Sequence, residues 1–337
     1  MTGNRIKLAR MANGLSLQQL SDRMKSRGIS FTKTSLFNYE ADMTVPNPQL
    51  LDIFADALGV NRHFFTHDSP ENFSVRLIED LGSVEARRQE VLAYIQVQLE
   101  YLISLVNLSG EKDVFQANNP APVNVESEED VTAAADQLRN RWRIGALPIA
   151  SVCSLLEQNG WFIFELPEFF KWEYISGVEE SNNIHFIFFS RNPHLDELRS
   201  GLLRELGKHL ITCRSSRQEE YLSVFASSLL LPCEAIYKDV GKERTQIDSE
   251  ELRLLKLKYG LSRLDILKRL SQCGILDTQS YLSAYGHLRQ SYYISRSYQH
   301  VVPLHFFEEV TRMNLLVRRL LAEDKIPGEE VLDYSIY

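Results

Sequence analysis

Residues 204–208 read Arg-Glu-Leu-Gly-Lys, which is the spacing of a hydrolytic zinc helix whose metal ligands have been replaced. Side chains at positions i and i+4 share one face of a helix, so two histidines there can bind one zinc ion beside a glutamate that serves as general base. Arg204 and Lys208 occupy those positions, and protonated cations cannot donate a lone pair to zinc. Only the glutamate, Glu205, is kept. The sequence therefore predicts a helix with the spacing of a zinc site but without the histidines that would bind the metal.

The residues on both sides of this motif extend the similarity. The run DELRSGLLRELGKHLI is followed by QEEYLSVFASSLLLP at 218–232. Together they resemble the ImmA/IrrE family of peptidase-like domains, with the pattern RxRFTLAHELGHLLL followed by ExxANxFAxxLLMP. Arg199 matches the leading arginine of that pattern, and Glu219 stands in the place of the third zinc ligand. The resemblance implies a degenerate metal site made of Arg204, Glu205, Lys208 and Glu219.

The altered site is expected to be structural. A carboxylate between two cations can replace a metal as a polar crosslink, so we expect Glu219 to pair with Arg204 and Lys208, and Glu219→Ala to destabilise the fold. His209 lies on a face rotated by about 100 degrees from the metal face, and a relocated zinc site that uses it stays an open alternative. We expect no bound metal, no cofactor and no catalytic residue beyond the remnant Glu205.

Residues 1–66 carry a second set of motifs. Ser16 with Gln19 three residues later forms a capping box that opens a helix. The run VPNPQLLDIFADALGV closes the segment. These features resemble the helix-turn-helix of the Cro/repressor (XRE) family, in which Arg10 and Glu40 would form a buried ion pair. The resemblance implies a DNA-binding domain over residues 1–66.

The third helix of this domain, from about residue 32 to 41, is expected to turn Leu36 and Tyr39 inward. Its opposite face would enter the major groove, where lysine reads guanine and asparagine pairs with adenine. Phe37 could pack on thymine methyl groups. The predicted DNA-binding residues are Lys33, Thr34, Ser35, Phe37 and Asn38 on this helix, with Ser16 and Gln18 on the preceding one.

Residues 67–128 are predicted to connect two domains. Apolar residues from Leu92 to Val106 recur with heptad spacing and predict a long helix. This helix could pair with its copy in a dimer or pack on the second domain, and both alternatives stay open. Turn formers, two prolines and an acidic cluster over 109–130 then predict a linker.

Residues 129–290 are predicted to form the peptidase-like domain, and 291–337 a C-terminal helical extension. The domain begins as helix, turn, helix and strand. The next strand, NNIHFIFFSR, alternates little between apolar and polar residues and is therefore expected to be central in a sheet. The predicted fold class is mainly α with a small β-sheet (α+β).

Composition limits the class of protein. With 44% hydrophobic residues in a chain of 337, the sequence is typical of a globular protein. Residues 1–65 hold eight Lys/Arg and five Asp/Glu, so a basic head of +3 precedes a body of −11. No stretch reaches 18 uninterrupted apolar residues, so we expect a cytoplasmic protein without membrane contact. The four cysteines form no CxxC pair, and we expect four buried thiols without a disulfide.

The sequence as a whole favours a homodimeric DNA-binding transcriptional regulator. We expect a repressor that binds a palindromic operator and regulates its own operon, as relatives in mobile elements and toxin-antitoxin loci do. The peptidase-like domain would be inactive, and its groove would bind a partner protein, a peptide or a small effector. Two alternatives stay open: an active zinc metallopeptidase that cleaves a repressor, and an antitoxin-like scaffold that binds a partner protein.

Overall fold

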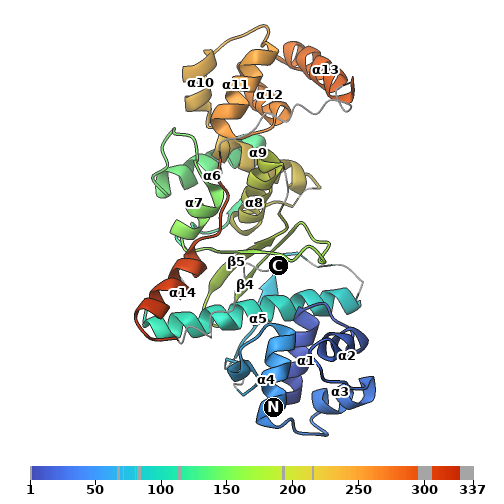
Figure 1. Ribbon diagram of the computed structural model, residues 1–337. Coiled ribbons are helices and arrows are strands. Elements are labelled where there is room, and N and C mark those ends of the chain that lie inside the picture. The colour runs from blue at the N-terminus through green and yellow to red at the C-terminus, as the bar shows by residue number, and fades with distance from the viewer. Residues whose placement is uncertain are drawn as a thin grey trace.

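The computed structural model describes residues 2–66, 69–70, 72–79, 81, 85–111, 116–191, 194–214, 216–294 and 306–326. The protein is about 57% helical with a small mixed sheet, so the predicted α+β class is confirmed. Figure 1 shows an elongated molecule with the N-terminal helices at one end, the sheet in the middle and the helices of residues 233–294 at the other end.

The N-terminal end is a compact helical unit. Its elements are α1 (Thr2–Ala12), α2 (Leu17–Lys25), α3 (Lys33–Glu40), α4 (Pro48–Leu58) and the 3-10 helix η1 (Arg62–Phe65). The predicted capping box is present: Gln19 N donates to Ser16 Oγ at 3.2 Å, and Ser16 N donates to Gln19 Oε1 at 2.8 Å. Asn47 caps α4, and Gly59 ends it in the left-handed conformation at φ 62.

The long helix α5 (Glu85–Ser109) lies between this unit and the rest of the protein (Figure 1). Ile95, Leu99 and Leu102 are fully buried in the core that α5 shares with the sheet. Ala93 and Val97 contact α1 instead. Of the two alternatives for this helix, packing on the second domain is the one that the structure forms, because its heptad face is covered by its own sheet.

The length and apolarity of α5 would also suit a membrane span. The segment Arg87–Ser109 is long and apolar enough to cross a membrane, with a mean hydropathy of 1.4 in its most apolar window. However, 61% of that window is buried inside the protein. Burial against the sheet and against α1 therefore accounts for the buried apolar residues of this segment.

The main sheet has the order β1, β4, β5, β3. Its strands are β1 (Val75–Leu77), β3 (Phe162–Glu165), β4 (Tyr174–Glu179) and β5 (Ile184–Phe189). The predicted central position of β5 is confirmed: it runs antiparallel to β4 and parallel to β3. One face of the sheet presents Phe164 and Phe188 to the α5 core, and the other presents Ile187 and Phe189 to the helices on the opposite side.

The segment predicted as a connector takes part in both sheets. Strand β1 pairs with β4 in the main sheet. A second strand from this segment, β2 (Val123–Asn124), pairs in parallel with β6 (Ile211–Thr212). The described parts of residues 67–128 are therefore built into the second domain rather than running between two domains; residues 67–68, 71, 80, 82–84 and 112–115 lie outside the described residues.

Helices cover the far face of the sheet and then extend away from it (Figure 1). The covering helices are α6 (Glu128–Arg141), α7 (Val152–Gln158), α8 (Leu195–Leu210) and α9 (Gln218–Leu230). The distal helices are α10 (Cys233–Val240), α11 (Ser249–Tyr259), α12 (Arg263–Gln272) and α13 (Thr278–Ile294). In the C-terminal extension, α14 (Arg312–Ala322) returns to α5, where Met313 and Val317 join the α5 core.

A buried ion pair fixes the C-terminal extension. Arg199 on α8 donates to Glu308 at 2.5 Å, and both side chains are 0% exposed. Glu308 also accepts from the amides of Val152 and Cys153 at the start of α7, at 3.1 and 2.9 Å. The leading arginine of the family pattern thus binds a carboxylate that caps a neighbouring helix. Residues 295–305 and 327–337 of the extension lie outside the described residues.

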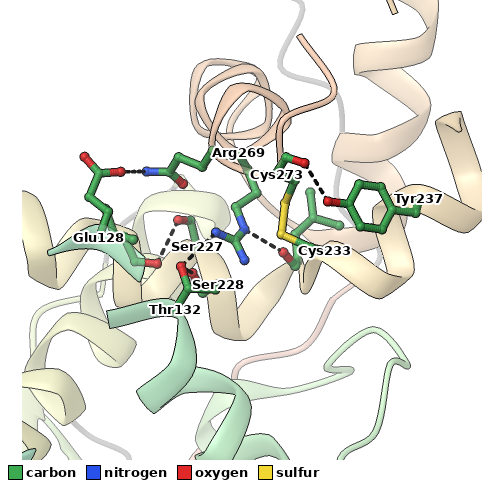
Figure 2. Close-up of a disulfide and its surroundings, with 11 residues drawn as sticks. Glu128, Thr132, Ser227, Ser228, Cys233, Tyr237, Arg269 and Cys273 are labelled. Carbon is green, nitrogen blue, oxygen red and sulfur yellow. Dashed lines mark hydrogen bonds between the residues drawn. A yellow bond between two sulfur atoms is a disulfide. The ribbon is translucent and has the colours of Figure 1, made fainter. Parts of the chain in front are cut away.

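The prediction of four thiols is wrong for two of the cysteines. Cys233 and Cys273 form a disulfide, with an S–S distance of 2.07 Å and a Cα–Cα distance of 5.5 Å (Figure 2). Cys153 and Cys213 take no part in a disulfide, and Cys153 is buried as predicted. The two bonded cysteines are 40 residues apart, and only the packing of α10 beside the end of α12 brings them together.

Candidate functional site

Helix α3 is fixed through its inward side chains. Leu36 is buried, and the Tyr39 ring packs edge-on against Phe31 and Phe54, with centroids 5.8 and 5.9 Å apart. The ion pair that the XRE resemblance implied is present: Arg10 donates to both oxygens of Glu40 at 2.5 and 2.9 Å. A bidentate pair of this kind fixes the end of α3 against α1.

The outward face of α3 carries side chains that could reach a ligand. Lys33 and Thr34 are exposed, and the Phe37 side chain is 52% exposed. Asn38 is half-buried at the edge of this face. Ser35 is also half-buried, and its Oγ lies 2.9 Å from Thr32 Oγ1 in the N-cap, so it takes part in the start of the helix.

The two predicted contact residues on α2 lie at its first turn. Ser16 and Gln18 are both exposed. The Ser16 hydroxyl accepts from Gln19 N as the helix cap, and the Gln18 side-chain amide donates to Asp22 at 2.8 Å. Both side chains therefore already have an intramolecular partner, and the Gln18 amide keeps a second N–H that could donate to a phosphate.

The helical unit is attached to α5 by contacts that the motifs did not predict. Arg5 on α1 donates to Glu100 on α5 at 2.5 Å, and the two side chains are only 9% and 6% exposed. Arg5 also donates to the Phe64 carbonyl at 2.9 Å and stacks over the Phe64 ring at 3.7 Å. In the sequence, the only sign of this contact is Glu100, a charged residue within the apolar part of α5. The unit is therefore fixed on the second domain.

On α8, which carries the Arg204–Lys208 motif, Glu205 is paired inside the protein. Lys208 Nζ lies 2.7 Å from Glu205 Oε1 and 2.8 Å from Glu79 Oε2. The Ser176 hydroxyl donates to the other Glu205 oxygen at 2.8 Å. Burial lowers the pKa of Lys208, but Glu205 and Glu79 outweigh it, so the pKa lies above its usual value and the ammonium stays charged. Both carboxylate oxygens of Glu205 are therefore engaged.

The prediction that Glu219 joins this cluster is wrong. Glu219 is exposed in the first turn of α9, and among the described residues the carboxylates that reach Lys208 within 4.0 Å belong to Glu205 and Glu79. Sequence reasoning missed Glu79, because it lies in the segment predicted as connector. Arg204 is half-buried near Tyr174: burial raises the pKa of Tyr174 to about 12, and the charge of Arg204 opposes that rise.

A second buried cluster adjoins α8. His209 and His185 lie 5.5 Å apart between ring centroids, and each contacts the Trp161 ring, at 4.7 and 5.1 Å. Burial lowers the pKa of His209 to about 3, with the charges of His185, Arg76 and Lys208 acting in the same direction. Burial and Arg76 lower the pKa of His185. Both rings are therefore neutral at physiological pH.

The donor set for a relocated metal site is incomplete. His209 Nε2 and His185 Nδ1 are buried and have no hydrogen-bond partner in the described part of the chain. In that same part, no group of three or more histidine, cysteine, aspartate or glutamate side chains is arranged to hold a metal ion. Two imidazoles beside an indole are fewer ligands than a zinc site in a protein uses.

Comparison of the chain with protein-family models, with curated proteins and with solved structures found no match.

Proposed function

We propose that the protein is a sequence-specific DNA-binding transcriptional regulator that represses its own operon. The observation that carries the proposal is the exposed face of α3, where Lys33, Thr34 and Phe37 point outward from a helix whose other face is fixed. Lysine can donate to guanine, and the phenyl ring can contact a thymine methyl group. The fit of the motifs around α2 and α3 to the XRE pattern supports the same proposal.

The regulator would bind DNA as a homodimer in the cytoplasm. One recognition helix reads only a few base pairs, and two-fold symmetry lets two copies engage the halves of a palindromic operator. The heptad face of α5 packs on its own sheet, so the dimer contact would have to come from another surface.

The second domain would be a metal-free pseudo-peptidase that serves as a sensor or docking surface. Lys208 and Ser176 engage the oxygens of Glu205, and a general base needs a carboxylate oxygen that can accept a proton from water. Lys208 also fills the position of a metal ligand with a positive charge. These contacts count against hydrolysis at Glu205, and the domain would instead bind a peptide, a small effector or a partner protein.

Selection from a random duplex library tests the DNA proposal, because such a library needs no assumed operator sequence. The full-length protein would be incubated with the library, and the bound duplexes would be sequenced over several rounds. The proposal expects one enriched motif with two-fold symmetry. Recovery of duplexes with no shared sequence would contradict it.

Metal content tests the pseudo-peptidase proposal. Elemental mass spectrometry of the purified protein should find far less than one zinc per chain. The variant Arg204→His, Lys208→His returns two imidazoles to one face of α8 and should bind zinc more tightly than the wild type. One zinc per wild-type chain that survives dialysis against a chelator would contradict the proposal.

A further inference from the structure

The disulfide joins two helices at a point where several chain segments meet (Figure 2). Cys233 is the first residue of α10, and Cys273 is the C-cap of α12. The 40-residue separation between them includes the whole of α11. The bond therefore closes a loop that contains most of the distal helices.

Noncovalent contacts tie the same elements together. Tyr237 on α10 donates to the Cys273 carbonyl at 2.6 Å. Arg269 on α12 is 0% exposed and donates to the Leu231 carbonyl at the end of α9, at 3.0 Å. Gln272 donates to Glu128 on α6 at 2.8 Å. Cleavage of the disulfide would leave these contacts in place, so α12 would keep its position against α6 and α9.

The two sulfur-bearing residues differ in their exposure. Cys273 is only 7% exposed, whereas Cys233 is half-buried and is followed by the exposed Glu234. Thiol-disulfide exchange begins with a thiolate that attacks one sulfur while the other leaves. An external thiolate can approach Cys233 more readily, which makes the Cys273 sulfur the leaving group.

We propose that Cys233 and Cys273 form a thiol-disulfide exchange site that latches α10 onto α12. A dithiol reductant opens it in two steps. One thiolate of the reductant bonds to Cys233 Sγ, and the Cys273 thiolate leaves and takes up a proton. The second thiolate of the reductant then displaces Cys233, which also takes up a proton. The protein gains two electrons and two protons, and the reductant leaves as a disulfide.

Opening should act mainly on α10. This helix has eight residues, and only Ala235, Ile236 and Val240 bury their side chains. After reduction it is held by these residues, by the Tyr237 hydrogen bond and by Asp239, which accepts from Lys258 Nζ at 2.6 Å and from the Tyr259 hydroxyl at 2.7 Å on α11. Figure 1 places α10 at the end of the molecule opposite α3, so the latch does not depend on the proposed DNA-binding function.

Hydrogen-deuterium exchange of the full-length protein, oxidised or reduced with dithiothreitol in native buffer, tests this proposal. Thiol alkylation with mass spectrometry first establishes the state of each cysteine. Reduction should speed exchange of the α10 amides roughly tenfold or more, while α8, α9 and the N-terminal unit stay unchanged. Excess reduced glutathione should also open the bond, and oxidised glutathione should restore it.

Two variants keep the test specific. Cys233→Ser should show the fast α10 exchange in either buffer, and Cys213→Ser should behave as the wild type. If Cys233→Ser does not fold, the wild-type comparison still decides. A disulfide that resists native reduction would overturn the proposal, as would thiols that glutathione disulfide cannot join or α10 exchange that is equal in the two states.

Discussion

Helices α3 and α8 both carry residues that the sequence singled out as functional, but the side chains of these residues lie in opposite environments. On α3, Lys33, Thr34 and Phe37 point away from the protein. On α8, Glu205 and Lys208 pair with each other, and Ser176 and Glu79 complete the cluster. A polar side chain that is already paired and half-buried stabilises the fold, whereas an exposed one is available to a ligand.

The contrast follows from where each helix packs. Helix α8 lies between the sheet and α9, with Leu202, Leu203 and Leu206 fully buried. Any charge on its flanks must therefore find a partner within the protein. Helix α3 has one buried face and one free face, so the polar residues on its free face have no such requirement, whereas the buried Glu40 is paired with Arg10.

Removing the most buried charge of α8 should cost the most stability. Arg199→Ala leaves Glu308 without its cationic partner in a site where both side chains are 0% exposed. The free energy of unfolding should fall by about 3–5 kcal/mol, as for other broken buried ion pairs. Urea denaturation followed by circular dichroism measures this loss.

Arg253→Ala is the matched control for this variant. Arg253 pairs with Glu250 on the surface of α11, where the contact is exposed to solvent. Its loss should leave the urea midpoint almost unchanged. If the Arg199 and Arg253 variants gave equal midpoints, the buried pair would not be stabilising α8.

The cluster around Glu205 should matter more than Glu219. Lys208→Ala leaves the buried Glu205 without its cation and should lower the free energy of unfolding by about 2–3 kcal/mol. Glu219→Ala removes an exposed carboxylate and should change it by about 0.5 kcal/mol or less. Thermal melts of the two variants decide the point. The reverse order would restore Glu219 as the crosslink.

Acid should destabilise the second domain through its buried histidines. The folded pKa of His209 is about 3, below the unfolded value of about 6.5, so the unfolded chain binds a proton that the folded chain does not. Stability is therefore lost as pH falls below about 6.5. Between pH 7 and pH 5 the loss from His209 should be about 2 kcal/mol. In the variant His209→Gln, the free energy of unfolding should depend less on pH than in the wild type. Equal pH dependence in the two proteins would show that His209 takes up a proton as readily in the folded chain as in the unfolded one.

Local contacts were the part of the structure that the sequence predicted best. The Ser16–Gln19 capping box spans four residues, and the central strand β5 has its own apolar pattern. The Arg10–Glu40 pair, expected from the XRE resemblance, is also present, because the packing of the helical unit fixes the distance between α1 and the end of α3. Each of these features depends on short-range geometry or on a motif that covers the whole unit.

Contacts between distant segments were missed. Glu79 comes from the end of β1, Glu308 from the C-terminal extension, and Cys273 lies 40 residues from its partner. None of these residues has a spacing that identifies its partner, because tertiary packing alone brings them together. The predicted Glu219 contact failed for the same reason: the nearer carboxylates on α8 and beside β1 reached Lys208.

DNA affinity is the most direct test of the contrast between α3 and α8. Fluorescence anisotropy on a selected duplex, at one fixed salt concentration, would compare the wild type with the variants Lys33→Ala and Asn38→Ala and with the double variant. Lys238→Ala on α10 removes the same charge at the far end of the molecule (Figure 1) and is the control. Each α3 variant should lose about 1–3 kcal/mol of binding free energy, and the control none. Equal affinity of the wild type and the double variant would contradict the assignment of α3 as the DNA-reading helix.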